Sequence, residues 1–313
     1  MKLKLVVALV LLVLAGAPAG YAQQAGMVSL FDFGSSVRAL GMGNAFAGLA
    51  DDEQALLYNP AGLALLDQLR AHAMFASHLG NSTLGSLVGA LPSFGAGLQF
   101  YGVGGLEQRD AQDTVLGPLH YGQFALLAAG ALRLGPFIGV PSLSNLGLGL
   151  RVKFLSVNTL AAGSGTTFAF DPSVLWEVGN LRLGPLSLQA LRLGAALDNL
   201  GPGIGYGSGH KESLGLGARL GVSARVQDAV TTSFEFNSAD GLHLGGEYVF
   251  PVALGTLAVR AGLQTLNGFT VNVGLGYRYQ KLFRIDYAFS SHARLGGSHM
   301  LALSLAYNVG RLF

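Results

Sequence analysis

From Thr231 onward, apolar and polar residues alternate with a period of two in one segment after another. Because the side chains of a β-strand point alternately to its two faces, this period predicts strands with one apolar face. Residues 268–280 are typical, with Phe269, Val271, Val273, Leu275, Tyr277 and Tyr279 opposite Thr270, Asn272, Gly274, Gly276, Arg278 and Gln280. Segments 233–237, 242–250, 257–264 and 283–290 repeat the pattern.

The polar face of these predicted strands is rich in glycine and carries only isolated charges. A sandwich in water would instead expose a face rich in Lys, Glu and Thr. In a membrane, a sheet must close on itself, since an open edge leaves backbone groups without hydrogen bonds. The pattern therefore predicts an all-β fold, a transmembrane antiparallel β-barrel whose apolar face contacts lipid and whose small and polar face lines the lumen.

The composition indicates an exterior that is not in water. Of the 313 residues, 50% are hydrophobic and 12% are charged, whereas soluble domains carry about 25% charged residues. Spanning helices are disfavoured, because the uncharged stretch 71–106 contains glycines and a proline at intervals that would break them. The absence of cysteine excludes disulfides, thiolate metal sites, cysteine nucleophiles and a lipid-modified N-terminal cysteine.

Residues 1–22 have the form of an export signal. Lys2 and Lys4 precede an apolar stretch, and Gly20-Tyr21-Ala22 forms a small-x-small cleavage site. A retained membrane anchor is the alternative, but the apolar stretch is short for a spanning helix. Removal of this segment leaves 17 basic and 17 acidic residues, so we expect no nucleic-acid partner.

The alternation and the turn residues predict about 14 strands, an even number that puts both chain ends on the periplasmic side. Twelve or sixteen strands are the alternatives, because the first seven segments alternate less cleanly. The predicted strands are 71–79, 83–91, 95–103, 119–133, 146–157, 165–177, 185–198, 213–223, 229–237, 241–250, 255–265, 268–279, 281–290 and 299–310. Connections 104–118, 199–212 and 291–298 are long and face outward, while 134–145 is an unexplained long inward link.

Residues 23–70 lack the strand pattern. We expect a short helix after Asp51 and Asp52, with one of these acids as its N-cap. Pro60 should stop this helix, because the residue before a proline is pushed out of helical geometry. Pro60-Ala61-Gly62 should then form a tight reversal.

Three sequence blocks in this region are specific: RALGMGNAF at 38–46, the acids at 51–52, and YNPAGL at 58–63. Together they resemble the N-terminal plug of FadL-like and PorV/PorQ-like outer-membrane barrels. A weaker similarity links LDNLGPGI at 197–204 to a turn of the PorV-like proteins. The resemblance implies a barrel at 71–313 with residues 23–70 folded inside the lumen as a small helical hatch. It implies these hatch or gate residues: Arg38, Gly41, Gly43, Asp51, Asp52, Asn59, Pro60 and Gly62.

The resemblance implies two activities. FadL-like barrels pass long-chain fatty acids or other hydrophobic molecules, and PorV-like barrels carry or tether secreted proteins in type IX secretion. We expect the first: passive uptake across the bacterial outer membrane by a monomer, with capture in an apolar lumen pocket and hatch displacement near Asn59 and Pro60. The partners are then outer-membrane lipid and a hydrophobic ligand. A secretion partner that binds secreted proteins is the alternative, and a purely structural barrel is a third hypothesis.

Six charged residues fall on the lumen side of the C-terminal strands: Glu235, Glu247, Arg260, Arg278, Arg284 and Asp286. They form either a ladder of ion pairs that braces the barrel and holds the hatch, or a selectivity lining. A second feature, the glycines at 102, 104 and 105, is either a plain turn or a kink that opens the wall laterally.

The sequence does not favour an enzyme. No G-x-S-x-G elbow is present, and the seven histidines lack the spacing of a metal or catalytic site. Gly41-Met42-Gly43 matches half of a dinucleotide fingerprint, but Phe46 stands at the third position and no strand precedes it. We therefore expect no cofactor and no metal.

Overall fold

A computed structural model describes residues 30–33, 36–78, 81–159, 163–265, 269–280, 282–292 and 296–308. The proposed export signal lies outside these residues. Fourteen antiparallel strands form a ring that the pairing of β5 with β6 closes. They are β1 (Leu69–His78), β2 (Ser82–Leu91), β3 (Phe94–Arg109), β4 (Val115–Arg133), β5 (Leu146–Thr159), β6 (Gly163–Leu183), β7 (Leu186–Asp198), β10 (Gly217–Val226), β11 (Val230–Asn237), β12 (Gly241–Val252), β13 (Gly255–Gln264), β14 (Thr270–Tyr279), β15 (Phe283–His292) and β16 (Gly296–Tyr307).

The prediction of a closed barrel with 14 strands is confirmed, and each predicted strand overlaps one strand of the ring. Two further short strands, β8 (Ile204–Tyr206) and β9 (Lys211–Glu212), form a hairpin beside β6 in the long connection after β7. We call the end at which β1 begins and β16 ends the terminal mouth, and the opposite end the loop mouth.

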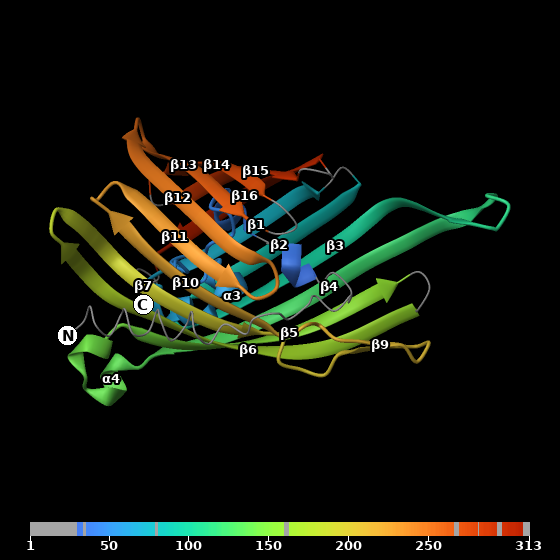
Figure 1. Ribbon diagram of the computed structural model, residues 1–313, viewed down its shortest axis with the longest axis horizontal. Coiled ribbons are helices and arrows are strands. Elements are labelled where there is room, and N and C mark those ends of the chain that lie inside the picture. Colours follow the sequence, from blue (N-terminus) through green and yellow to red (C-terminus); the bar gives the residue numbers. More distant parts are fainter. Residues whose placement is uncertain are drawn as a thin grey trace.

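The β3–β4 hairpin is longer than the sequence predicts, because β3 does not end at Val103. The pairing with β4 shifts between Val103 and Leu106, and Gly105 adopts a φ of +70°. Gly104 and Gly105 therefore form a β-bulge, and pairing continues beyond it to Arg109. The interpretation of this glycine cluster as a plain turn is wrong, and Figure 1 shows the hairpin projecting past the other strands at the right.

The long link 134–145 folds into two short helices at the terminal mouth, α4 (Gly135–Ile138) and η3 (Pro141–Leu143). Its two prolines stand in the first turns of these helices, where the missing N–H group costs nothing. The link is therefore compact despite its length, and α4 lies at the lower left in Figure 1.

The two faces of the strands differ as the alternation predicts. In β14, Val271, Val273 and Leu275 are about half exposed, while the intervening Asn272 is 0% exposed. The outward side chains form an apolar exterior, and the inward ones are buried against material in the bore. Hydrocarbon outside and packed protein inside explain why the chain carries so few charges.

The bore is filled by the segment between Leu30 and Leu66, which contains η1 (Leu30–Phe33), α2 (Val37–Gly41), α3 (Ala55–Tyr58) and η2 (Pro60–Leu65). Helix α2 contacts β13 to β16 on one side of the ring, and η2 contacts β3 to β6 on the other. Most side chains of this segment are buried, and Figure 1 shows its blue ribbon behind the orange strands. No helix among the described residues is long and apolar enough to cross a bilayer.

Two expectations for the turn around Pro60 are wrong. Helix α3 begins at Ala55 with Gln54 as its N-cap, and neither Asp51 nor Asp52 caps it. The Asp52 carboxylate accepts a hydrogen bond from the Gln54 N–H (3.0 Å), ahead of the helix, and both acids form ion pairs with Arg38. Pro60 begins the 3-10 helix η2 rather than a tight reversal, and Asn59 caps that helix by accepting from the Ala61 N–H.

Two wall glycines allow the N-terminal segment to lie directly against the sheet. A Cβ atom on Gly262 would overlap the Gly43 nitrogen, and one on Gly245 would overlap the Met42 carbonyl oxygen. Gly43 itself has a φ of +63°, which favours glycine. Backbone thus contacts backbone at this point, and the glycine-rich inward face has a steric cause.

Replacing Gly245 by valine should loosen the N-terminal segment. The new side chain would collide with Met42, and overpacking of this kind costs about 1–3 kcal/mol. We expect a lower midpoint of thermal unfolding in detergent and faster protease cleavage within residues 36–66. Gly246→Val is the matched control, because a Cβ on Gly246 meets nothing within 4 Å. Equal unfolding midpoints and cleavage rates in the two variants would contradict the close approach of Met42 to Gly245.

Candidate functional site

Arg38 ties the N-terminal segment to the barrel wall. Its guanidinium donates two hydrogen bonds to Glu247 of β12, at 2.8 and 3.0 Å, in a fork-shaped arrangement. The same group pairs with Asp51 and, at 2.9 Å, with Asp52. The Arg38 side chain is 8% exposed, so these contacts are shielded from water.

The contacts continue along the wall as one network. Arg260 donates to Glu247 at 2.6 Å and to Asp286 at 2.8 Å. Arg284 donates to Asp286 at 2.6 Å and reaches Asp52 at 3.2 Å. Four of the six predicted lumen residues therefore lie together with three predicted hatch residues. We call this set the first ion network: Arg38, Asp51, Asp52, Glu53, Glu247, Arg260, Arg284 and Asp286.

The pKa values of Asp52 and Glu53, the two acids before α3, are shifted in opposite directions. Burial alone would raise the pKa of Asp52, but the guanidinium groups of Arg38 and Arg284 hold it well below its usual range. Burial, and then the charge of Asp52, raises the pKa of Glu53. Asp52 is therefore the carboxylate that balances the two arginines.

The other two predicted lumen residues lie apart from this network. Glu235 accepts hydrogen bonds from the backbone N–H groups of Phe46 (2.8 Å) and Ala47 (2.7 Å), so it also holds the N-terminal segment. Arg278 lies near the terminal mouth and is exposed. Within the described part of the chain, no carboxylate forms an ion pair with Arg278.

The remaining predicted gate residues shape the backbone of the segment. Asn59 donates from Nδ2 to the carbonyl oxygens of Ala47 (2.8 Å) and Val174 of β6 (3.0 Å), which joins two turns of the segment to the wall. A Cβ on Gly62 would overlap the Ala50 carbonyl oxygen, and Gly41 faces Gly274 of β14. Whether these residues move as a gate remains a prediction.

A second ion network escaped the sequence analysis. Arg151 of β5 donates to Asp171 (2.6 Å) and to the carbonyl oxygens of Leu56 (2.7 Å) and Leu57 (2.6 Å) at the end of α3. The other members are Lys153, Asp171, Asp198 and Arg219. Arg151 and Lys153 are spaced by two residues in an otherwise apolar segment, which is the signal that marks an inward strand face.

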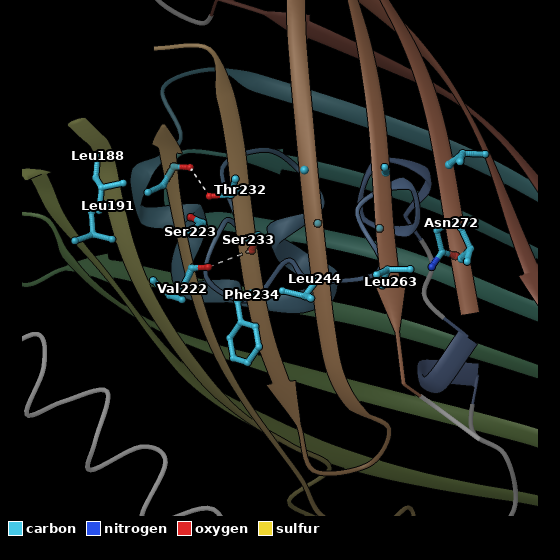
Figure 2. A pocket seen from close by; sticks show the side chains of 17 residues that line it. Leu188, Leu191, Val222, Ser223, Thr232, Ser233, Phe234, Leu244, Leu263 and Asn272 are labelled. Atoms are coloured by element: carbon cyan, nitrogen blue, oxygen red, sulfur yellow. Dashed lines mark hydrogen bonds between the residues drawn. The ribbon is translucent and has the colours of Figure 1, made fainter. Parts of the chain in front are cut away.

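An apolar concavity of about 830 Å³ lies on β7 and β10 to β14. Figure 2 shows the side chains that line it. The lining residues carry no charge and are Leu188, Leu191, Val222, Ser223, Ala224, Thr232, Ser233, Phe234, Leu244, Gly245, Gly246, Ala261, Gly262, Leu263, Val271, Asn272 and Val273.

The concavity opens on the lipid side of the wall. Phe234, Leu244 and Leu263 belong to the outward faces of their strands, and the N-terminal residues that touch Gly245 and Gly262 from inside do not line it. In Figure 2 the N-terminal helices lie behind the strands that carry these side chains. We expected an apolar pocket inside the lumen, but this cavity lies on the outside of the wall. The N-terminal segment occupies the bore at this level.

The polar side chains at the concavity are mostly satisfied within the protein. Ser223 donates to the Gly48 carbonyl oxygen (2.9 Å), and Thr232 donates to that of Ala224 (3.3 Å). Among the described residues, no group of three His, Asp or Glu side chains could hold a metal ion. The concavity can therefore accommodate an apolar molecule and offers no evident reactive group.

The closed ring of strands defines the protein as a transmembrane β-barrel of 14 strands. The toluene transporter TodX of Pseudomonas putida has a similar structure, with a TM-score of 0.57 at 12% identity over 86% of this chain and 97% of TodX. The monoaromatic hydrocarbon channel CymD gives a TM-score of 0.51 at 11% identity over 87% of this chain and 96% of CymD. No family model and no curated protein matches the chain.

At these identities, the likeness shows the fold alone. The two similar structures are described as a toluene transporter and a monoaromatic hydrocarbon channel. The PorV-like and PorQ-like side of the resemblance remains a prediction from the N-terminal sequence blocks.

Arg38→Gln should destabilise the N-terminal segment strongly. It leaves three carboxylates without their shared cation, and breaking a buried pair costs about 3–5 kcal/mol. We expect faster hydrogen exchange of backbone amides in residues 36–58 and a lower unfolding midpoint. The control is Arg109→Gln, whose exposed pairs with Glu107 and Asp113 are worth about 0–1 kcal/mol. Equal effects of the two substitutions would show that Arg38 does not hold the N-terminal segment against the barrel wall.

Proposed function

We propose that this protein is an outer-membrane channel for the passive uptake of small hydrophobic molecules. The observation that carries this proposal is the uncharged concavity of about 830 Å³, which adjoins the N-terminal segment through the wall. Its volume lies within the range of about 300–1,000 Å³ that ligand pockets occupy. The shared fold with TodX and CymD supports the same class of function.

The lining favours an uncharged hydrocarbon over a fatty acid. No arginine, lysine or histidine lines the concavity, so a carboxylate there would lack a counter-ion. An apolar molecule would gain roughly 25 cal/mol for each Å² of surface that it buries. A monoaromatic hydrocarbon, the class carried by CymD, fits these conditions.

The route inward passes the N-terminal segment, which acts as a hatch. At Gly245 and Gly262 only the backbone of the sheet separates the concavity from Met42 and Gly43. Displacement of the hatch requires separation of Arg38 from Glu247 and release of Asn59 from Val174. The molecule then moves down its concentration gradient to the terminal mouth. The bulge at Gly105 in β3 offers a second place where the wall could part.

The alternative of a PorV-like secretion partner rests on the N-terminal sequence blocks. Co-purification of a secreted protein with the barrel would favour that alternative. A barrel that neither binds hydrocarbons nor co-purifies with a protein would favour the purely structural hypothesis.

Filling the concavity should abolish hydrocarbon binding without disturbing the fold. Gly246 lies in the lining and a Cβ there meets open space, so Gly246→Phe places a ring in the cavity. We expect the affinity of the purified barrel for toluene, measured by competition with a fluorescent apolar probe, to fall about tenfold, equivalent to about 1.4 kcal/mol. Toluene uptake by cells that express the variant should fall in parallel.

Gly89→Phe is the matched control, because Gly89 of β2 also lies in open space but outside the concavity. Its toluene binding should equal that of the unsubstituted protein. Unchanged binding by Gly246→Phe would exclude this concavity as the hydrocarbon site, and no binding by any form would count against the proposed function.

A further inference from the structure

A second pocket, of about 200 Å³, lies at the terminal mouth. Three arginines from different strands line it: Arg70 of β1, Arg278 of β14 and Arg284 of β15. The other lining residues are Glu53, Gln68, Leu282, Phe283, Ser304, Leu305 and Ala306. We call it the arginine pocket, and its chemistry differs from that of the uncharged concavity.

Two of these arginines lie directly opposite each other, and among the described residues no carboxylate forms an ion pair with both. Arg278 and Arg284 are direct cross-strand partners in the β14–β15 ladder, and their side chains leave the same inward face. Like charges placed directly opposite each other on adjacent strands are destabilising. Arg284 is balanced by Asp52 and Asp286, whereas Arg278 has no ion pair among the described residues.

Arg70 adds a further incompletely balanced cation. Its closest acid is Asp67 at 3.8 Å, on a side chain that is 77% exposed. The Arg70 Nε atom is buried and has no hydrogen-bond partner among the described residues. A buried donor without an acceptor is costly, so this group favours an acceptor from outside the chain.

The acids near the pocket do not cancel this charge. Glu53 lines the pocket, but its carboxylate already pairs with Arg284 at 3.3 Å. Among the described residues, Glu53 forms no ion pair with Arg70 or Arg278. The pocket therefore holds an excess of positive charge at Arg70 and Arg278, with the Ser304 hydroxyl as a further polar group.

The rim of the pocket is apolar. Leu282 and Leu305 are 53% and 49% exposed, and Phe283 and Ala306 complete this side. Leu305 belongs to the outward face of β16, where it alternates with the buried Ser304. A molecule in the pocket would thus contact arginines at one end and hydrocarbon side chains at the other.

We propose that the arginine pocket binds an oxyanion head group, a carboxylate or a phosphate, that is carried on a hydrocarbon chain. A planar guanidinium donates two parallel hydrogen bonds to such a group, and two arginines can share one oxyanion. The bound anion offsets the repulsion between Arg278 and Arg284 and supplies an acceptor to Arg70. The hydrocarbon chain lies along Leu282, Phe283 and Leu305 toward the lipid.

The test compares four probes on the full barrel in neutral maltoside micelles: dodecanoate, dodecyl phosphate, inorganic phosphate and dodecanol. Calorimetric titration, with empty micelles as the blank, gives each affinity. We expect both dodecyl anions to bind, while dodecanol and inorganic phosphate bind at least about tenfold more weakly. Arg278→Gln should weaken dodecanoate binding about tenfold, and the Arg70→Gln/Arg278→Gln double variant should abolish it.

Arg182→Gln is the matched control. Arg182 is an exposed arginine in β6 at the same mouth but outside the pocket, so its loss removes one charge without altering the site. Dodecanoate binding should be unchanged in this variant. A loss as large as that of Arg278→Gln would mean that general charge, and not the pocket, attracts the anion, and would overturn the proposal.

Two further results would also overturn it: equal binding of dodecanol and dodecanoate, or unchanged binding in Arg278→Gln. Inorganic phosphate that binds as tightly as dodecyl phosphate would overturn the requirement for a hydrocarbon chain. A difference in affinity between dodecanoate and dodecyl phosphate identifies the preferred head group as a carboxylate or a phosphate. These titrations do not measure toluene, so the pocket and the hydrocarbon channel can fail independently.

Discussion

Closure of the sheet in hydrocarbon is the constraint on which the rest of this structure depends. Lipid supplies no hydrogen-bond partner, so every backbone group of the wall must pair with a neighbouring strand. The pairing of β5 with β6 meets this requirement by joining the two ends of the sheet. Closure also divides the side chains into two sets, because a charge that faces lipid at the midplane costs about 2–4 kcal/mol. The charges of the spanning strands are therefore directed inward, where they need partners.

The N-terminal segment supplies those partners, and the wall supplies partners to the segment. Glu247 is balanced by Arg38 of the segment and Arg260 of the wall, and Asp52 is balanced by Arg38 and Arg284. In the first ion network, the segment contributes one arginine and three acids, while the wall contributes two arginines and two acids. Removal of the segment would take one buried partner from Glu247 and two from Arg284, and losing part of a buried pair is far more costly than losing an exposed pair. The two parts are thus one electrostatic unit, even though only one of them spans the membrane.

The alternation of apolar and polar residues, together with the turn residues, predicts about 14 strands, because its period reports directly which face meets lipid. It left twelve or sixteen strands open, since the first seven segments alternate less cleanly. It also identified Glu247, Arg260, Arg284 and Asp286 as inward residues. The pattern carries no information on partners across the bore, so the link from Arg38 to Glu247, 209 residues apart, required the structure. The bulge at Gly105 was missed because glycine is equally compatible with a turn. Arg151 and Lys153 were missed because the alternation around them is weaker, and the cavity could not be predicted because it depends on the shape of the wall.

The glycines that let the N-terminal segment fill the bore also explain where the apolar concavity lies. Gly245 and Gly262 let Met42 and Gly43 approach the sheet from inside, and the lipid side at these glycines forms part of the concavity. At these two positions the wall is reduced to its backbone. A hydrocarbon in the concavity and the N-terminal segment in the bore would then be separated there by the backbone of the sheet. Larger inward side chains there would push the segment away and remove the direct backbone contact. The small residues that allow the segment to seat therefore also bring the candidate hydrocarbon site close to it.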